Sequence, residues 1–200
     1  PPGGHLRYIA SVFKNHRRSL LTAGTGQLFA QAIRSGRSII VPLYGAEVLG
    51  LGYEQVGLIL SIAGLIDMSL FYPAGLIMDR FGRKFAIIPS FTLQAIGMAF
   101  IPLTLEFAPL LNSTGLILFA NGLFPTITGA FISLMLATCL IGFGNGLSSG
   151  AMMTFGADLA PREGMSEYLS LWRLIGDGGH LGGPLAIGSI AAIPGLSPPA

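Results

Sequence analysis

Long apolar stretches separated by short charged turns are the feature that most constrains this chain. A helix needs about 20 mostly apolar residues to cross a bilayer, and the sequence offers five such stretches, at residues 19–49, 54–78, 85–104, 130–158 and 168–193. Only 10% of the 200 residues are charged and 52% are hydrophobic, whereas soluble domains carry about 25% charged residues. The pattern predicts an all-α, polytopic transmembrane bundle of about five helices.

The segments outside these stretches divide the rest of the chain. Residues 1–18 are polar and basic, and we interpret them as a cytoplasmic leader, either a loop or a surface helix. Residues 105–130 are apolar but interrupted by prolines and glycines, so we expect a long, partly membrane-associated connection. A transmembrane domain over 19–193 and a short tail over 194–200 follow. Because the chain begins at Pro1 rather than a methionine, we interpret it as a fragment or a processed piece of a longer protein.

The placement of the cations predicts the orientation. Eight loop cations lie on one side of the expected bundle: four before the first stretch, three between the second and third, and one between the fourth and fifth. The loops on the other side carry none. Since positively charged loops stay in the cytoplasm, the N-terminus is predicted to be cytoplasmic. The small net charge of +2 indicates no nucleic-acid partner.

An ordered motif closes the second stretch and carries a family resemblance. The segment GLIMDRFGRK resembles the G-x-x-x-D-R-x-G-R-K signature of the major facilitator superfamily of transporters, and its defined positions are Gly75, Asp79, Arg80, Gly82, Arg83 and Lys84. Gly75 allows close approach of two helices. Gly82 permits a tight reversal between spans. A chance cytoplasmic loop would explain the cations but not their spacing.

The resemblance implies a mechanism and an incomplete architecture. In similar proteins the aspartate and second arginine of the loop latch one conformation together with an acid at the cytoplasmic end of the fourth span; here these are Asp79, Arg83 and Asp158. The alternative is that they are ordinary interfacial charges. Transporters of this kind have two six-helix halves with the solute between them at mid-membrane. The chain would supply five helices of one half, with a second half missing.

A second motif lies in the fifth stretch. The segment GHLGGPLAIG resembles the G-x-x-x-G-P-x-x-G-G motif of drug and proton antiporters in the superfamily, with Ile187 at one of the glycine positions; the matching residues are Gly179, Gly183, Pro184 and Gly188. Small residues also allow close helix packing, and proline bends a helix. Simple packing therefore remains the alternative interpretation.

Polar and ionisable residues within the stretches form three stripes. Such residues are costly in a bilayer and normally face protein or a water-filled pathway. At helical spacing they fall on one side of the first, second and fifth stretches and are predicted to line one polar cavity; the candidates are Gln27, Gln31, Arg34, Arg37, Asp67, Arg173, Asp177 and His180. We expect Asp67, Asp177 or His180 to exchange a proton during transport. Static structural pairing is the alternative.

Together these features predict a secondary transporter of a small organic solute, with proton-coupled export by alternating access. It would be an integral protein of the plasma membrane, with no enzymatic activity, cofactor or metal. A facilitative uniporter or importer is one alternative. A rhomboid-like intramembrane serine protease is another, because residues 146–150 read G-x-S-x-G around Ser148 and His180 could serve as the base.

Overall fold

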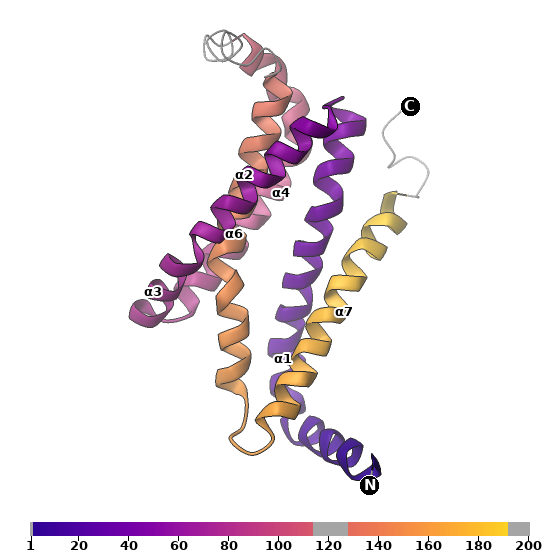
Figure 1. Cartoon of the computed structure of the whole chain (residues 1–200), viewed down its shortest axis with the longest axis vertical. Coiled ribbons are helices and arrows are strands. Elements are labelled where there is room, and N and C mark those ends of the chain that lie inside the picture. The colour runs from indigo at the N-terminus through magenta and orange to yellow at the C-terminus, as the bar shows by residue number, and fades with distance from the viewer. Residues whose placement is uncertain (1, 114–127, 192–200) are drawn as a thin grey trace. The chain divides into compact units, whose positions relative to one another are not determined.

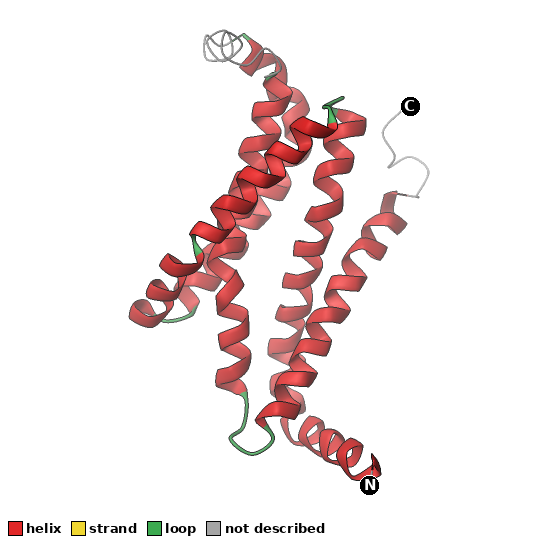
Figure 2. Cartoon of the chain, in the orientation of Figure 1, coloured by secondary structure: helices red, strands yellow, loops and turns green. Residues whose placement is uncertain are grey.

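The computed structural model describes residues 2–113 and 128–191, and every regular element in these two ranges is helical (Figure 2). The all-α fold class is thereby confirmed. Three helical stretches are long and apolar enough to cross a membrane: Tyr53–Phe81, Lys84–Asn112 and Gly129–Leu159. These correspond to the second, third and fourth predicted spans.

The first and fifth predicted spans are helical but less apolar. They belong to helices α1 (Pro2–Leu43) and α7 (Met165–Ala191), neither of which is among the three apolar stretches. Arg34 and Arg37 in α1 and Arg173 and Asp177 in α7 lower the mean hydropathy of these helices. That α1 and α7 cross the bilayer therefore stays a prediction.

Helix α1 includes the basic leader. The leader is helical from Pro2, and a kink at His16, whose backbone has φ −111° and ψ 16°, separates most of it from the long part of α1. At the other end Pro42 has no N–H to donate, and the regular helix gives way to a short π-helix, η1 (Tyr44–Val48). The Leu49 N–H donates to the Tyr44 carbonyl at 3.1 Å, five residues back.

The second span is broken in the middle. It consists of helices α2 (Tyr53–Ser69) and α3 (Phe71–Phe81), which meet at Leu70. Pro73 explains the position of the break, because its ring interferes with the carbonyl of the residue four positions earlier and removes one helical hydrogen bond.

The third span is longer than the sequence suggested. Helix α4 (Lys84–Asn112) continues through Pro89, Pro102 and Pro109, so the prediction that residues 105–112 belong to an irregular connection was wrong. Prolines are tolerated in membrane helices when neighbouring groups satisfy the freed backbone. The rest of the expected connection, residues 114–127, lies outside the described residues. The Asn112 Oδ1 atom accepts a 2.7 Å hydrogen bond from the N–H of Gly129, where helix α6 (Gly129–Leu159) begins.

The chain falls into two compact units, each with its own core. One comprises residues 1–39 and 152–200, the other residues 40–151. In the first unit, α1 and α7 run side by side (Figure 1), and their core is Val12, Leu20, Tyr168 and Trp172. In the second unit, α2, α4 and α6 enclose a core that includes Val41, Ile59, Leu134 and Ile141. The predicted tail, residues 194–200, lies outside the described residues.

Candidate functional site

One face of α7 consists of glycines that pack directly on the backbone of α1. Gly176, Gly179 and Gly183 are buried. A Cβ atom at Gly179 would lie 2.1 Å from the carbonyl oxygen of Leu28, and one at Gly183 would lie 2.4 Å from that of Ala32. No side chain fits in such a space, so these glycines allow the two helices to approach at backbone distance.

The remaining positions of the second motif do not share in this packing. A Cβ atom at Gly188 would have no described neighbour within 4 Å. Pro184 is half-buried, and α7 continues past it to Ala191. Helix packing thus accounts for two of the four motif residues.

The predicted glutamines of α1 meet this glycine face. Gln27 is only 9% exposed, and its Nε2 atom lies 2.9 Å from where a Cβ of Gly176 would be. The Cγ atom of Gln31 lies 3.5 Å from the same point. The Gln27 Oε1 atom is buried without a hydrogen-bond partner among the described residues. Buried acceptors of this kind are usually satisfied by water or a ligand.

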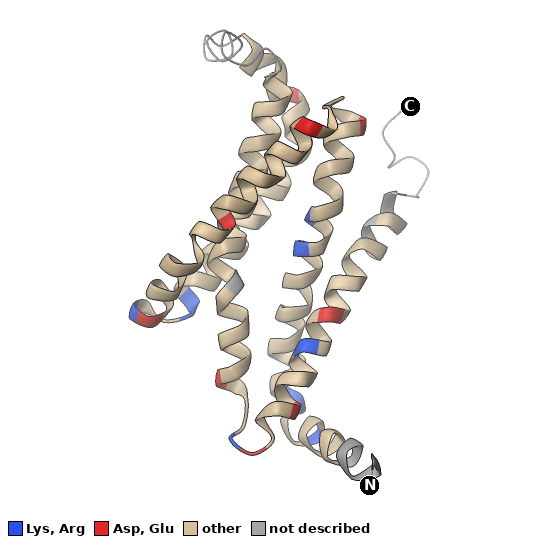
Figure 3. Ribbon diagram, viewed as in Figure 1, with Lys and Arg blue, Asp and Glu red and all other residues tan. Residues whose placement is uncertain are grey.

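The ionisable stripe of α7 lies beside the glycine face. Arg173, Asp177 and His180 are all exposed, and each follows a residue of the buried face by one position, which turns it by about 100°. Figure 3 shows charged positions along α1 and α7 between largely uncharged segments. Packing of α7 on α1 therefore leaves these three side chains uncovered. On α1 itself, Arg34 and Arg37 are half-buried.

In the second unit, Asp67 is held against α6. Its Oδ2 atom accepts a hydrogen bond from Asn145 Nδ2. The backbones are close here as well, because a Cβ atom at Gly146 would lie 2.6 Å from the Asp67 carbonyl oxygen, and one at Gly142 would lie 2.6 Å from that of Ala63. Asp67 is half-buried. The contact joins one ionisable group of the apolar spans to a neutral amide.

A buried polar cluster between α4 and α6 was not predicted. Gln94 Nε2 donates to Ser90 Oγ at 3.0 Å and to Ser148 Oγ at 3.4 Å, and Ser90 Oγ donates to the Gly144 carbonyl at 2.6 Å. Ser90 and Gln94 belong to a row of buried residues at helical spacing: Ala86, Ser90, Gln94, Gly97, Ile101 and Thr104. That periodicity was the signal in the sequence that could have identified them.

The signature loop between α3 and α4 adopts the predicted reversal. Gly82 ends α3 with φ +90°, a conformation that favours glycine, and its N–H donates to the Met78 carbonyl at 3.0 Å. Asp79, Arg80 and Lys84 are exposed and Arg83 is half-buried.

Other features of the signature differ from expectation. The Arg80 guanidinium lies 5.6 Å from the centre of the Phe81 ring, a cation–π distance. A Cβ atom at Gly75 would have no described neighbour within 4 Å, so the close approach expected there is not found in the described chain. Asp158 is exposed in the last turn of α6, and its role in a latch stays a prediction.

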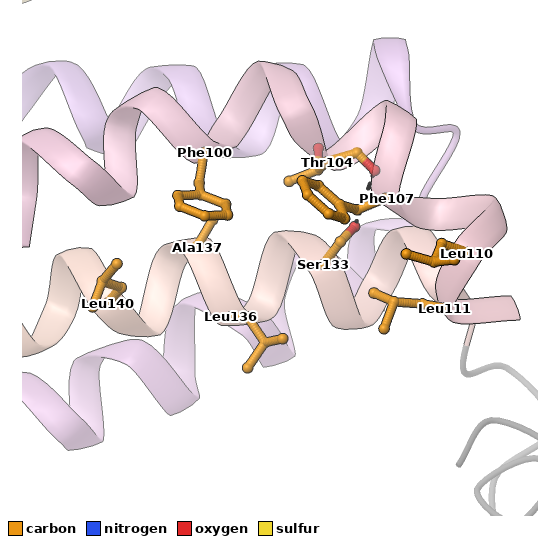
Figure 4. A pocket seen from close by; sticks show the side chains of 9 residues that line it. All are labelled: Phe100, Thr104, Phe107, Leu110, Leu111, Ser133, Leu136, Ala137 and Leu140. Carbon is orange, nitrogen blue, oxygen red and sulfur yellow. Dashed lines mark hydrogen bonds between the residues drawn. The ribbon is translucent and has the colours of Figure 1, made fainter. Parts of the chain in front are cut away.

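An apolar pocket opens between α4 and α6, and no ionisable side chain is among the residues that line it. Its volume is about 250 Å³, and Phe100, Phe107 and Leu136 are among the residues that line it (Figure 4). Its two hydroxyl side chains are Thr104 and Ser133, and Ser133 Oγ donates to the Thr104 carbonyl at 3.3 Å. Within the described ranges, no group of three His, Cys, Asp or Glu side chains could hold a metal ion.

Comparison with known proteins gives the family. No match was found among curated proteins or among solved structures. The family model described as Major Facilitator Superfamily matches residues 7–184, which include the signature loop, the glycine face of α7 and both ionisable stripes of the first unit. Proteins of this family are membrane transporters and typically not enzymes, which favours transport over the protease alternative. The chain belongs to the Major Facilitator Superfamily of secondary transporters.

Proposed function

We propose that this chain is part of one half of a secondary transporter that exports a small organic solute in exchange for protons. Together with a second six-helix half it would bind the solute near mid-membrane and expose it to each side in turn. The cytoplasmic latch would be formed by Asp79, Arg83 and Asp158. The plasma membrane is the proposed location.

The observation that carries the proposal is the uncovered stripe of α7. Arg173, Asp177 and His180 are exposed although the adjacent face of the same helix is tightly packed on α1. Exposure of three ionisable groups to hydrocarbon would be costly, so they need water, a solute or another part of the transporter beside them. A polar passage satisfies all three groups, and a carboxylate beside histidine can bind and release protons.

Polar groups in each unit are further candidates for solute binding or proton exchange. The unpartnered Gln27 Oε1 atom offers an acceptor to a solute or to water. In the second unit, the hydrogen bond from Asn145 orients Asp67, which is a second candidate for proton exchange. In the same hypothesis, Arg34 and Arg37 bind anionic groups of the solute.

The experiment is flux measured in proteoliposomes that contain the complete transporter. Ethidium serves as a fluorescent organic cation, and an imposed pH gradient supplies the driving force. We expect ethidium to move in one direction while protons move down the imposed gradient in the other. Asp177→Asn should abolish the dependence of ethidium flux on the gradient. Leu174→Ala is the matched control, because Leu174 is a 67% exposed apolar side chain of the same helix and should leave coupling intact.

Each outcome separates one part of the proposal from the others. Ethidium flux that ignores the gradient would remove proton coupling and favour the facilitative alternative. Coupled flux that survives Asp177→Asn but not Asp67→Asn would move the proton site to the second unit. Labelling of Ser148 by a serine-reactive fluorophosphonate would support the protease alternative instead.

A further inference from the structure

The basic leader leaves the line of α1 at a defined point. His16 has non-helical backbone angles, with helix on both sides of it, and Figure 1 shows the leader turning away from the long part of α1. The predicted first span begins only at residue 19. The leader therefore lies at the end of α1 where the membrane-embedded part is predicted to meet the cytoplasm.

One side of the leader is fixed to the turn between α6 and α7. Val12 is 6% exposed, and its Cγ2 atom lies 3.1 Å from where a Cβ of Gly164 would be. The Tyr8 hydroxyl lies 3.2 Å from the same point. Gly164 has φ +79°, a conformation that favours glycine. Because of these contacts the leader is a docked helix with a defined orientation.

The leader carries exposed cations around its kink. Lys14, before His16, and Arg17 and Arg18, after it, are exposed, and no aspartate or glutamate precedes Glu47 in the sequence. Two aromatic side chains of the leader are also partly exposed: Phe13 is 43% exposed, and Tyr8, whose hydroxyl approaches Gly164, is 44% exposed. The α6–α7 turn has one exposed cation, Arg162, and one exposed acid, Glu163, and half-buried Glu167 follows in the first turn of α7, so the leader is the more strongly positive of the two segments.

We propose that the leader lies on the cytoplasmic surface of the membrane and binds the headgroups of anionic phospholipids through Lys14, Arg17 and Arg18. The predicted first span, residues 19–49, would bring the bilayer beside this end of α1. Cations next to a transmembrane segment are attracted by the anionic leaflet, by about fivefold in affinity for each lysine or arginine. Exposed aromatic rings, tyrosine above all, favour the same interfacial layer. The contacts at Gly164 set the orientation of the leader.

The test places a spin label on the leader of the complete transporter. Ala10 is exposed, and Ala10→Cys in a background without other cysteines, including Cys139→Ala, takes the label. The protein is placed in nanodiscs of phosphatidylcholine with an increasing fraction of phosphatidylglycerol. Accessibility to a water-soluble nickel chelate should fall as phosphatidylglycerol increases. It should recover at about 1 M salt, where the screening length shortens to about 3 Å.

Charge variants separate headgroup binding from other contacts. Lys14→Gln with Arg17→Gln should shift the ratio of bound to detached leader about 25-fold, because two cations are lost, whereas Lys14→Arg with Arg17→Lys should retain the lipid dependence. Arg80→Gln with Lys84→Gln is the matched control, since it removes two exposed cations from another loop and should leave the leader unaffected. Thermal unfolding in the same nanodiscs checks that each variant is folded.

Two results would overturn the proposal. Equal protection of the label in discs without phosphatidylglycerol would mean that protein contact or apolar insertion covers the leader. A neutralised leader that followed the parent's lipid dependence would mean that its cations do not bind headgroups.

Discussion

Helices α6 and α7 are both rich in glycine, yet they use it differently. In the second unit, the glycines of α6 contact two neighbours: Gly142 and Gly146 approach α2, and Gly144 approaches α4. The polar side chains between them are buried and hydrogen-bonded. In the first unit, the close contacts of α7 with α1 are made by one glycine face, at Gly179 and Gly183, and the ionisable stripe beside it is exposed.

This difference shows how a polar residue in an apolar helix comes to be structural or available. A helix with small residues on two sides packs between two neighbouring helices, so its polar groups form hydrogen bonds within the protein. A helix with small residues on one side has a free face, and polar groups there need a partner from outside the unit. On this basis Asn145 and Ser148 stabilise the bundle, and Asp177 and His180 are the better candidates for a solute or a proton.

The glycine face of α7 should be the feature most sensitive to substitution. Gly179→Ala would place a methyl group 2.1 Å from the Leu28 carbonyl oxygen, so α1 and α7 must separate. Overpacking of this kind costs about 1–3 kcal/mol. Unfolding of the complete transporter by sodium dodecyl sulfate in mixed micelles measures the loss.

A neighbouring glycine provides the matched control. A Cβ atom at Gly178 would have no described neighbour within 4 Å, and Gly178→Ala should change the free energy of unfolding by less than about 0.5 kcal/mol. Equal costs at the two positions would mean that the two faces of α7 do not differ as described, and the comparison with α6 would fail.

The hydrogen bond between Asp67 of α2 and Asn145 of α6 should contribute less to the free energy of unfolding than the glycine face of α7 does. A double-mutant cycle with Asp67→Leu and Asn145→Leu isolates this hydrogen bond from the other interactions of either side chain. Measured couplings of this type in membrane proteins average about 0.6 kcal/mol and reach about 1.7 kcal/mol. A second cycle, Asp67→Leu with Thr92→Ala, should give a coupling near zero. A coupling energy near zero in the first cycle would mean that the hydrogen bond to Asn145 does not stabilise the bundle, and Asp67 would then be a candidate for binding a solute or a proton, as Asp177 is.

Much of the fold could be predicted from the sequence, because hydrocarbon length and hydropathy constrain helices strongly. The predicted fourth span, 130–158, agrees closely with Gly129–Leu159. The third span was predicted to end at residue 104, whereas α4 continues to Asn112. Pro109 misled the prediction, since proline ends helices in water more reliably than it does in a bilayer. The break at Leu70 depends on Pro73, whose effect periodicity alone does not reveal.

The candidate site was predicted less completely, because hydropathy does not identify which neighbour a helix face meets. Arg173, Asp177 and His180 share one side of α7, and the structure adds that the packed face is the one beside it. Ser90 and Gln94 were not predicted, because residues 85–104 contain no ionisable residue that would mark a polar side of the helix, and neutral polar side chains bury at a lower cost. Their helical spacing matched the buried row of α4, so a search for buried periodicity would have found them.

The buried cluster of α4 offers the finest test of the comparison. Ser90→Ala removes the 2.6 Å hydrogen bond to the Gly144 carbonyl and the acceptor of Gln94 Nε2. The expected cost is about 0.6 kcal/mol, the average for such bonds between membrane helices. Thr92→Ala is the control, because Thr92 is exposed and its hydroxyl donates only to Ile88 of its own helix at 2.9 Å. If the polar groups of α6 only form hydrogen bonds within the bundle, Ser90→Ala must destabilise the protein more than Thr92→Ala does. Solute flux per folded molecule must then stay the same. A loss of flux without a loss of stability would instead place this cluster on the transport pathway and reverse the assignment of α6 and α7.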